Sequence, residues 1–125
     1  MFPPVFETVA GDSDCQTNLG VSPTRFFPFG EAPPNVVRPY AVWTVVTGAP
    51  ENYINQIPDL DMWAIQVEVF AETADAARDA AEAVRNAIEP VAHLVAWRGE
   101  SRDVDTRLYR YSFDVDWMVS RETQS

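Results

Sequence analysis

The sequence predicts an α+β fold: a mixed, mostly antiparallel sheet of four to five strands with two helices packed on one face. Two patterns carry this prediction. From Tyr109 to Val119 every second residue is apolar or aromatic, the period of a strand with one buried and one solvent-facing side. Between Thr73 and Glu89 apolar residues recur three and four apart, as in an amphipathic helix. With 125 residues, one domain spanning residues 1–125 is expected.

The chain begins with a predicted helix that is broken in the middle. Apolar residues recur at helical spacing up to Val9, and Gly11 interrupts them. Ser13, followed three residues later by Gln16, resembles a capping box for a second short helix. We therefore expect one interrupted helix that ends near Gly20.

Three strands should follow. Arg25 to Phe29 is short, and Pro28 cannot donate to a ladder, so this strand should lie at a sheet edge. Aromatic and β-branched residues predict strands over Tyr40 to Thr47 and Met62 to Ala71. The polar segment Gly48 to Asp61 should connect them, and these two strands should pair as a hairpin.

The second half alternates helix and strand. Thr73 is a plausible N-cap for a helix that runs to Glu89 and ends at Pro90. Val91 to Trp97 predicts a strand and Arg98 to Asp105 a turn around Gly99. The last strand, Arg107 to Val119, should pair with the strand before it. At full extension this strand would be ~43 Å long. A compact domain of this chain length has a radius of gyration of ~14 Å, so the whole domain is only about as wide as the strand is long. The strand should therefore bend or reach past its own domain, which favours a role in assembly.

The charge balance limits the partners. The chain has 19 acidic and 9 basic residues, for a net charge of −10, which disfavours binding to nucleic acid through a phosphate-neutralising patch. A surface that repels DNA would suit a channel through which DNA slides. All nine bases are arginine. Genomic base composition explains this choice, and arginine also suits bidentate pairs at interfaces.

The sequence contains few signals of a cellular compartment or of enzymatic chemistry. Cys15 is the single cysteine, and neither a secretory signal nor a membrane span is predicted, so we expect a soluble intracellular protein. His93, the single histidine, has no nucleophile or carboxylate that spacing places nearby, so a histidine on the sheet surface or one with its hydrogen bonds satisfied is favoured over a catalytic base. Three aspartate pairs two apart lack the pattern of a calcium loop, so solvation or pairing with arginine is favoured over a metal site; they are Asp59 and Asp61, Asp103 and Asp105, and Asp114 and Asp116. No phosphate loop, nucleophile elbow or paired metal histidines occur. We therefore expect no catalytic residue, no cofactor and no enzymatic activity.

Two features favour contacts with other molecules. The connection Gly48 to Asp61 is longer than a hairpin needs and carries apolar groups, which suits a docking loop or, equally, a loop packed on its own sheet; the candidate docking residues are Glu51, Asn52, Tyr53, Ile54 and Ile57. Four tryptophans lie on predicted strands, where a core layer is favoured over a base-stacking platform; they are Trp43, Trp63, Trp97 and Trp117.

Four segments resemble a known family. Pro-Phe-Gly-Glu-Ala-Pro (residues 28–33), Arg-Pro-Tyr-Ala-Val-Trp (38–43), Thr-Gly-Ala-Pro-Glu-Asn-Tyr (47–53) and Tyr-Arg-Tyr-Ser-Phe-Asp-Val-Asp-Trp (109–117) resemble the tail-completion, or tail-terminator, proteins of long-tailed, siphovirus-like phages and prophages. The resemblance covers nearly the whole chain, including its length and element order.

The resemblance implies a structural virion protein and assigns no catalytic residue. Six copies would form a ring that caps the tail tube, ends its polymerisation and offers the surface to which the filled head joins. The implied partners are other copies of the chain, the major tail tube protein and head–tail connector proteins. The implied location is the neck region of the virion tail, after assembly in the host cytoplasm.

Charge gives a hypothesis for the subunit interface. Six copies would carry a formal charge of 6 × −10 = −60, so close approach needs arginines at the contacts. The candidate interface residues are Arg98, Arg102, Arg107, Arg110, Asp114 and Asp116 around the last hairpin. The surplus acids would then face solvent or a lumen through which DNA passes without specific binding. Two alternatives stay open: another head–tail connector or head-completion subunit, and a small-molecule-binding α/β regulatory domain.

Overall fold

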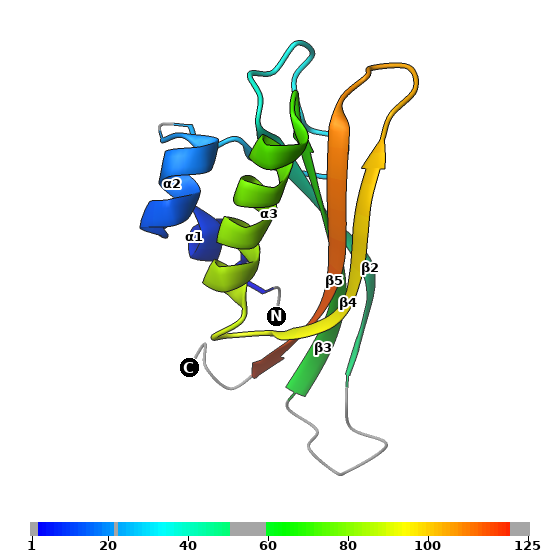
Figure 1. The fold of residues 1–125 in the computed structure, drawn as a ribbon. Helices are drawn as coiled ribbons and strands as arrows, with labels where there is room; N and C mark the ends of the chain where they lie inside the picture. The colour runs from blue at the N-terminus through cyan, green and yellow to red at the C-terminus, as the bar shows by residue number, and fades with distance from the viewer. Residues whose placement is uncertain (1–2, 22, 51–59, 121–125) are drawn as a thin grey trace.

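A computed structural model describes residues 3–21, 23–50 and 60–120 and shows a two-layer α+β fold (Figure 1). The elements are α1 (Val5–Ala10), α2 (Ser13–Leu19), β1 (Phe26–Pro28), β2 (Tyr40–Pro50), β3 (Leu60–Ala71), α3 (Ala74–Ile88), β4 (His93–Arg102) and β5 (Tyr109–Ser120). The five strands form one sheet in the order β1-β2-β3-β5-β4. β1 is parallel to β2 and every other pairing is antiparallel, so the predicted fold class and both predicted hairpins are confirmed.

The helices lie together on one face of the sheet (Figure 1). α1 packs on β1, and α3 packs on β3 and β5. The core between the layers contains the alternating residues of the long strands and the small-residue stripe of α3, as that alternation predicts. Its fully buried side chains include Val67, Phe113, Val115, Ala80 and Val84. The opposite face of the sheet has no described helix over it, and we call it the open face.

The N-terminal helix is broken as expected, but its second cap is one residue earlier than predicted. α1 ends at Ala10 with Gly11 as its C-cap, and the Asp12 carboxylate accepts the Cys15 backbone N–H at 3.1 Å. Ser13 is therefore the first helical residue and not the cap. Both residue types favour N-caps, and the acidic one has the additional advantage of charge at a helix N-terminus.

The fourth predicted strand is displaced. β4 starts at His93, not Val91, and runs through the expected turn to Arg102. Gly99 has φ +90° and lies where the β4–β5 register shifts, after Trp97. A glycine with positive φ inside a strand marks a bulge, so the glycine that suggested a turn bends the strand instead. The actual turn follows at residues 103–108, where the Asp103 carboxylate accepts the backbone N–H groups of Asp105 and Thr106.

The edge strand is confirmed, and the long hairpin is longer than predicted. β1 is a three-residue strand at the sheet edge. β2 continues through Gly48 to Pro50 and β3 begins at Leu60, so both ends of the predicted connection are strand. β5 is paired with β3 along its whole length, from Tyr109 to Ser120.

Candidate assembly surfaces

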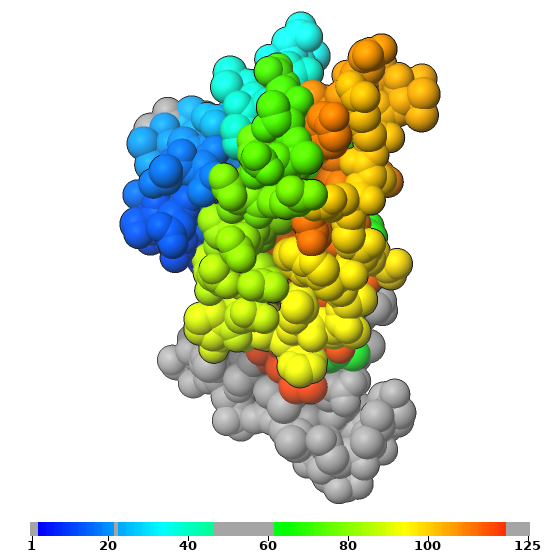
Figure 2. Space-filling model, viewed as in Figure 1, coloured from blue at the N-terminus to red at the C-terminus, as the bar shows by residue number. Residues whose placement is uncertain are grey.

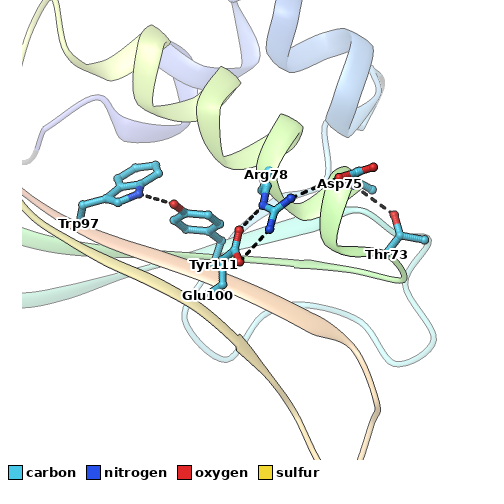
Figure 3. A network of polar contacts seen from close by, with 7 residues as sticks. Thr73, Asp75, Arg78, Trp97, Glu100 and Tyr111 are labelled. Carbon is cyan, nitrogen blue, oxygen red and sulfur yellow. Dashed lines mark hydrogen bonds and ion pairs between the residues drawn. The ribbon is translucent and has the colours of Figure 1, made fainter.

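The bare edge of the sheet at β4 carries a cluster of arginine and aromatic side chains. α3 reaches β4 through the side chain of Arg78, which donates to both carboxylate oxygens of Glu100, one of them at 3.1 Å, and also to Asp75 at 3.4 Å (Figure 3). The hydrogen bond from Arg78 lowers the pKa of the Glu100 carboxyl, and the same bond raises the pKa of Arg78. Both groups therefore stay charged, and the ion pair bridges the two elements.

Trp97 forms the aromatic centre of this cluster. Its indole N–H donates to the Tyr111 hydroxyl (Figure 3), and its ring lies 4.6 Å from the Tyr111 centroid and 5.2 Å from that of Phe113. The Arg85 guanidinium lies 4.9 Å from the Trp97 ring centroid, a cation–π distance. Trp97 is nevertheless 37% exposed, because no described helix packs over β4. The prediction of a tryptophan core layer is wrong for Trp97, whereas Trp117 is buried at 3% exposure.

The cluster continues to the end of the β4–β5 hairpin. Arg102 stacks over Tyr109 at 5.0 Å, and its Nε donates to the Arg107 carbonyl at 3.4 Å. A pocket opens beside it between the first turns of α3 and the hairpin, lined by Ala74, Ala77, Glu100, Ser101, Arg102, Tyr109 and Arg110. In Figure 2, orange atoms of the β5 segment are visible between the green α3 and the yellow β4. We call this surface the β4 shelf and define it by Arg78, Arg85, Trp97, Glu100, Arg102 and Tyr111.

The six predicted interface residues separate into two groups. Arg98 and Arg110 lie on the open face and already have partners within the chain: Arg98 pairs with Asp114 at 2.7 Å, and Arg110 pairs with Glu68 at 3.2 Å. Asp116, on the same face, lies opposite His93 across the ladder. Arg102 and Arg107, at the hairpin end, make no ion pair with a described residue, and Arg107 has φ +64°. Arg102 and Arg107 are therefore the hairpin arginines left available to a neighbour.

The pairing of Asp114 with Arg98 agrees with the interpretation favoured for these aspartates. Only Oδ2 of Asp114 is bonded, and its buried Oδ1 has no hydrogen-bond partner among the described residues. The hydrogen bond that Arg98 donates to Asp114 raises the pKa of Arg98. Exposed apolar side chains also occur on β2, β4 and β5, namely Val46, Val95 and Met118. The predicted docking residues Glu51, Asn52, Tyr53, Ile54 and Ile57 lie outside the described residues.

The other edge of the sheet, beside α1 and β2, is acidic where the β4 shelf is rich in arginine. A groove lined by Pro3, Pro4, Val5, Phe6, Glu7 and Trp43 lies between the start of α1 and β2. Phe6 is 41% exposed there. Residues 3–20 contain three acids and no base. We call the surface made by Pro4, Phe6 and Glu7 the α1 knob.

The described residues offer little for chemistry. Within residues 3–21, 23–50 and 60–120, no group of three or more histidine, cysteine, aspartate or glutamate side chains could hold a metal ion. The Cys15 thiol is buried and donates to the Ala83 carbonyl at 3.3 Å, and burial raises its pKa to about 12. Such a thiol is a poor nucleophile. Among the helices in the described part of the chain, none is long and apolar enough to cross a membrane.

The shelf was only partly indicated by the sequence. Arg78 and Arg85 are seven residues apart and so share a helix face. This spacing could have indicated that both side chains belong to one surface. Their partners Glu100 and Trp97 could not be placed without the bulge at Gly99.

Comparison with known proteins then gives the family. The family model described as tail completion protein gp17 matches residues 3–120, which include every helix and strand of the structure. A search of curated proteins found no match to the chain.

Proposed function

The chain belongs to the tail completion protein gp17 family, and from this premise we propose that six copies form a ring that caps the tail tube, ends its polymerisation and provides the surface for head joining. A phage tail-completion role makes the protein a structural component of the virion tail, and a structural role of this kind suggests a non-enzymatic protein. The observation that carries the proposal is that the family match runs from α1 to β5 without omitting an element.

The architecture supports assembly into a ring. A sheet of order β1-β2-β3-β5-β4 has two different edges, one at β4 and the other along β2 beyond the short β1. Contacts between different surfaces of identical subunits build rings when the rotation closes. The β4 shelf and the α1 knob are such different surfaces.

The charge distribution supports passage of DNA through the ring without specific binding. Residues 3–20 and 72–89, which contain all three helices, carry eight acids and two bases. The open face carries Glu68, Asp114 and Asp116 against Arg98 and Arg110. Neither surface has the excess of positive charge that holds phosphate backbones, so a lumen lined by either would let DNA slide.

The proposed partners are the major tail tube protein on one side of the ring and head–tail connector proteins on the other. The location is the neck, reached after assembly in the host cytoplasm. These assignments follow from what capping and joining require.

Electron microscopy of particles made without this protein tests the proposal. Overlong or uncapped tails that fail to join heads, corrected by adding the purified chain, are the expected result. Normal tails with leaking heads would instead identify a head-completion subunit. Absence of tube binding, together with a melting temperature that rises with a small metabolite, would identify a regulatory domain.

A further inference from the structure

We propose that the β4 shelf of one copy binds the α1 knob of the next copy, with Phe6 entering the pocket beside Arg102 and Glu7 facing the Arg102 guanidinium. This inference rests on the proposed ring, and it names the surfaces through which neighbouring copies meet. Trp, Tyr and Arg are the residues that dominate binding energy in protein interfaces, and the β4 shelf contains all three types in one exposed cluster.

The pocket and the knob match in chemistry. The pocket has Ala74, Ala77 and Tyr109 in its walls and Arg102 among its lining residues. The knob presents an exposed phenylalanine followed directly by a glutamate. Glu7 and Arg102 each lack an ion-pair partner among the described residues. An apolar group entering the pocket would therefore bring opposite charges together at its rim.

Charge selects the second copy as the occupant. The shelf contains three arginines and one glutamate in a chain with a net charge of −10. Residues 3–20 contain three acids and no base. Another copy approaching with its α1–α2 side therefore meets attraction, whereas most other orientations bring acid against acid.

Position in the fold fits a head-to-tail contact. α1 packs at the β1 end of the sheet and the shelf lies at the β4 end. In Figure 2 the blue α1–α2 region and the yellow-orange hairpin lie on opposite flanks of α3. Joining these edges keeps all helices on one surface of the ring and all sheets on the other, and the neighbour's α1 covers the strand that no described helix covers.

The contact should use side chains instead of extending the sheet. β4 has register shifts between Leu94 and Ala96 and between Trp97 and Gly99. Bulges of this kind discourage pairing of an edge strand with another chain. The aromatic and charged groups on the helix side of β4 stay available.

Crosslinking with engineered cysteines tests the geometry. The native Cys15 is buried with a raised pKa, so a maleimide reagent should leave it unmodified. The full-length chain carrying Glu7→Cys and Arg102→Cys, assembled on purified tail tubes and treated with a short bis-maleimide, should give a ladder up to six subunits. Each single variant should give no ladder. Efficient dimers from one single variant would indicate a two-fold contact and overturn the proposal.

A matched pair of surface phenylalanines tests the energetics. Phe6→Ser should weaken assembly at least about tenfold, whereas Phe29→Ser, at a site that is 73% exposed and belongs to neither the β4 shelf nor the α1 knob as defined, should not. Phe6 is only 41% exposed, so Phe6→Ser should also lower the stability of the fold. Assembly of both variants is therefore compared at a temperature at which circular dichroism shows each of them to be folded, which separates lost binding from lost folding. Arg102→Glu combined with Glu7→Arg should recover much of the assembly lost by either change alone.

The outcomes separate this inference from the proposed function. Rings that cap tubes without the Glu7→Cys and Arg102→Cys ladder, or that tolerate Phe6→Ser, would overturn the inference and leave the ring intact. A chain that neither caps tubes nor self-associates would overturn both.

Discussion

Replacing Trp97 by alanine should destabilise the fold more than breaking the ion pair beside it. Trp97 is 37% exposed, so nearly two-thirds of its surface is removed from solvent by Tyr111, Phe113 and Arg85. For a tryptophan this is ~150 Å², and at ~25 cal/mol per Å² the loss is ~4 kcal/mol as an upper estimate. Allowing for the alanine that replaces it, we expect about 3 kcal/mol, or a melting temperature about 10 °C lower.

The matched change is Arg78→Ala, which removes the ion pair with Glu100. The Arg78 and Glu100 side chains are 54% and 43% exposed. Ion pairs this exposed to solvent add little to stability because solvent screens them and two long side chains lose freedom. The Arg78→Ala variant should therefore melt close to the unchanged protein.

Thermal and urea unfolding of the two variants, followed by circular dichroism, measure the difference. Trp97→Phe serves as the control, because it keeps the stacking on Phe113 and loses only the indole hydrogen bond and part of the cation–π contact. An Arg78→Ala variant as unstable as Trp97→Ala would show that the charged bridge, and not aromatic packing, holds β4 against α3. The reasoning from buried area would then be wrong.

Four further outcomes are expected. Thr73→Ala should cost about 1 kcal/mol in urea unfolding because the Thr73 hydroxyl accepts the Ala76 N–H at the start of α3, and Thr73→Ser should restore it. Gly99→Ala should lower the free energy of unfolding by about 1–2 kcal/mol. Gly99 has φ +90° and no atom lies within 4 Å of the added Cβ, so the loss comes from backbone strain alone. An unchanged midpoint of urea unfolding would contradict the bulge. The Glu100 pKa is lowered in the folded chain, so its bond to Arg78 stabilises above the unfolded pKa of ~4.3, and this stabilisation is lost as pH falls through the lower folded value. The melting-temperature difference between the protein and its Glu100→Gln variant should be small at neutral pH, because the pair is exposed, and should vanish in acid. Raising salt from ~0.01 to ~0.15 M should strengthen ring assembly measured by sedimentation, because long-range repulsion among acidic copies is screened more than close arginine–acid contacts; steady weakening over that range would contradict this balance.

The sequence could predict those parts of the fold that depend on local periodicity. Phe113, Val115 and Trp117 alternate with polar residues, and the structure buries all three. Thr73 was the expected cap of α3 and is the cap. These successes share a cause: in a strand or helix with one buried face, apolar residues recur along the sequence with the period of that element.

The errors arose where pairing between distant residues decides the local geometry. Gly99 has a positive φ in both a turn and a bulge, and the neighbouring β5 determines which one forms. Arg98 and Arg110 are predicted to meet a neighbour's acids, and this stays a prediction, but the sequence did not show that the ladder also places Asp114 and Glu68 of the same chain beside them. The Arg110–Glu68 pair spans 42 positions, a separation that no local pattern reveals.

The position of β4 at the sheet edge also explains why the β4 shelf contains large, partly exposed aromatic side chains. A strand at the edge of a two-layer fold has a neighbour on one side and, for β4, no described helix above it. Large side chains there must bury themselves against their own strand neighbours, and Trp97 does so against Tyr111 and Phe113 while 37% of it stays exposed. Covering this remaining surface with a second copy would gain apolar burial without any change of fold. The chain thus concentrates aromatic and arginine side chains at the place where, in the proposed ring, one subunit would meet the next.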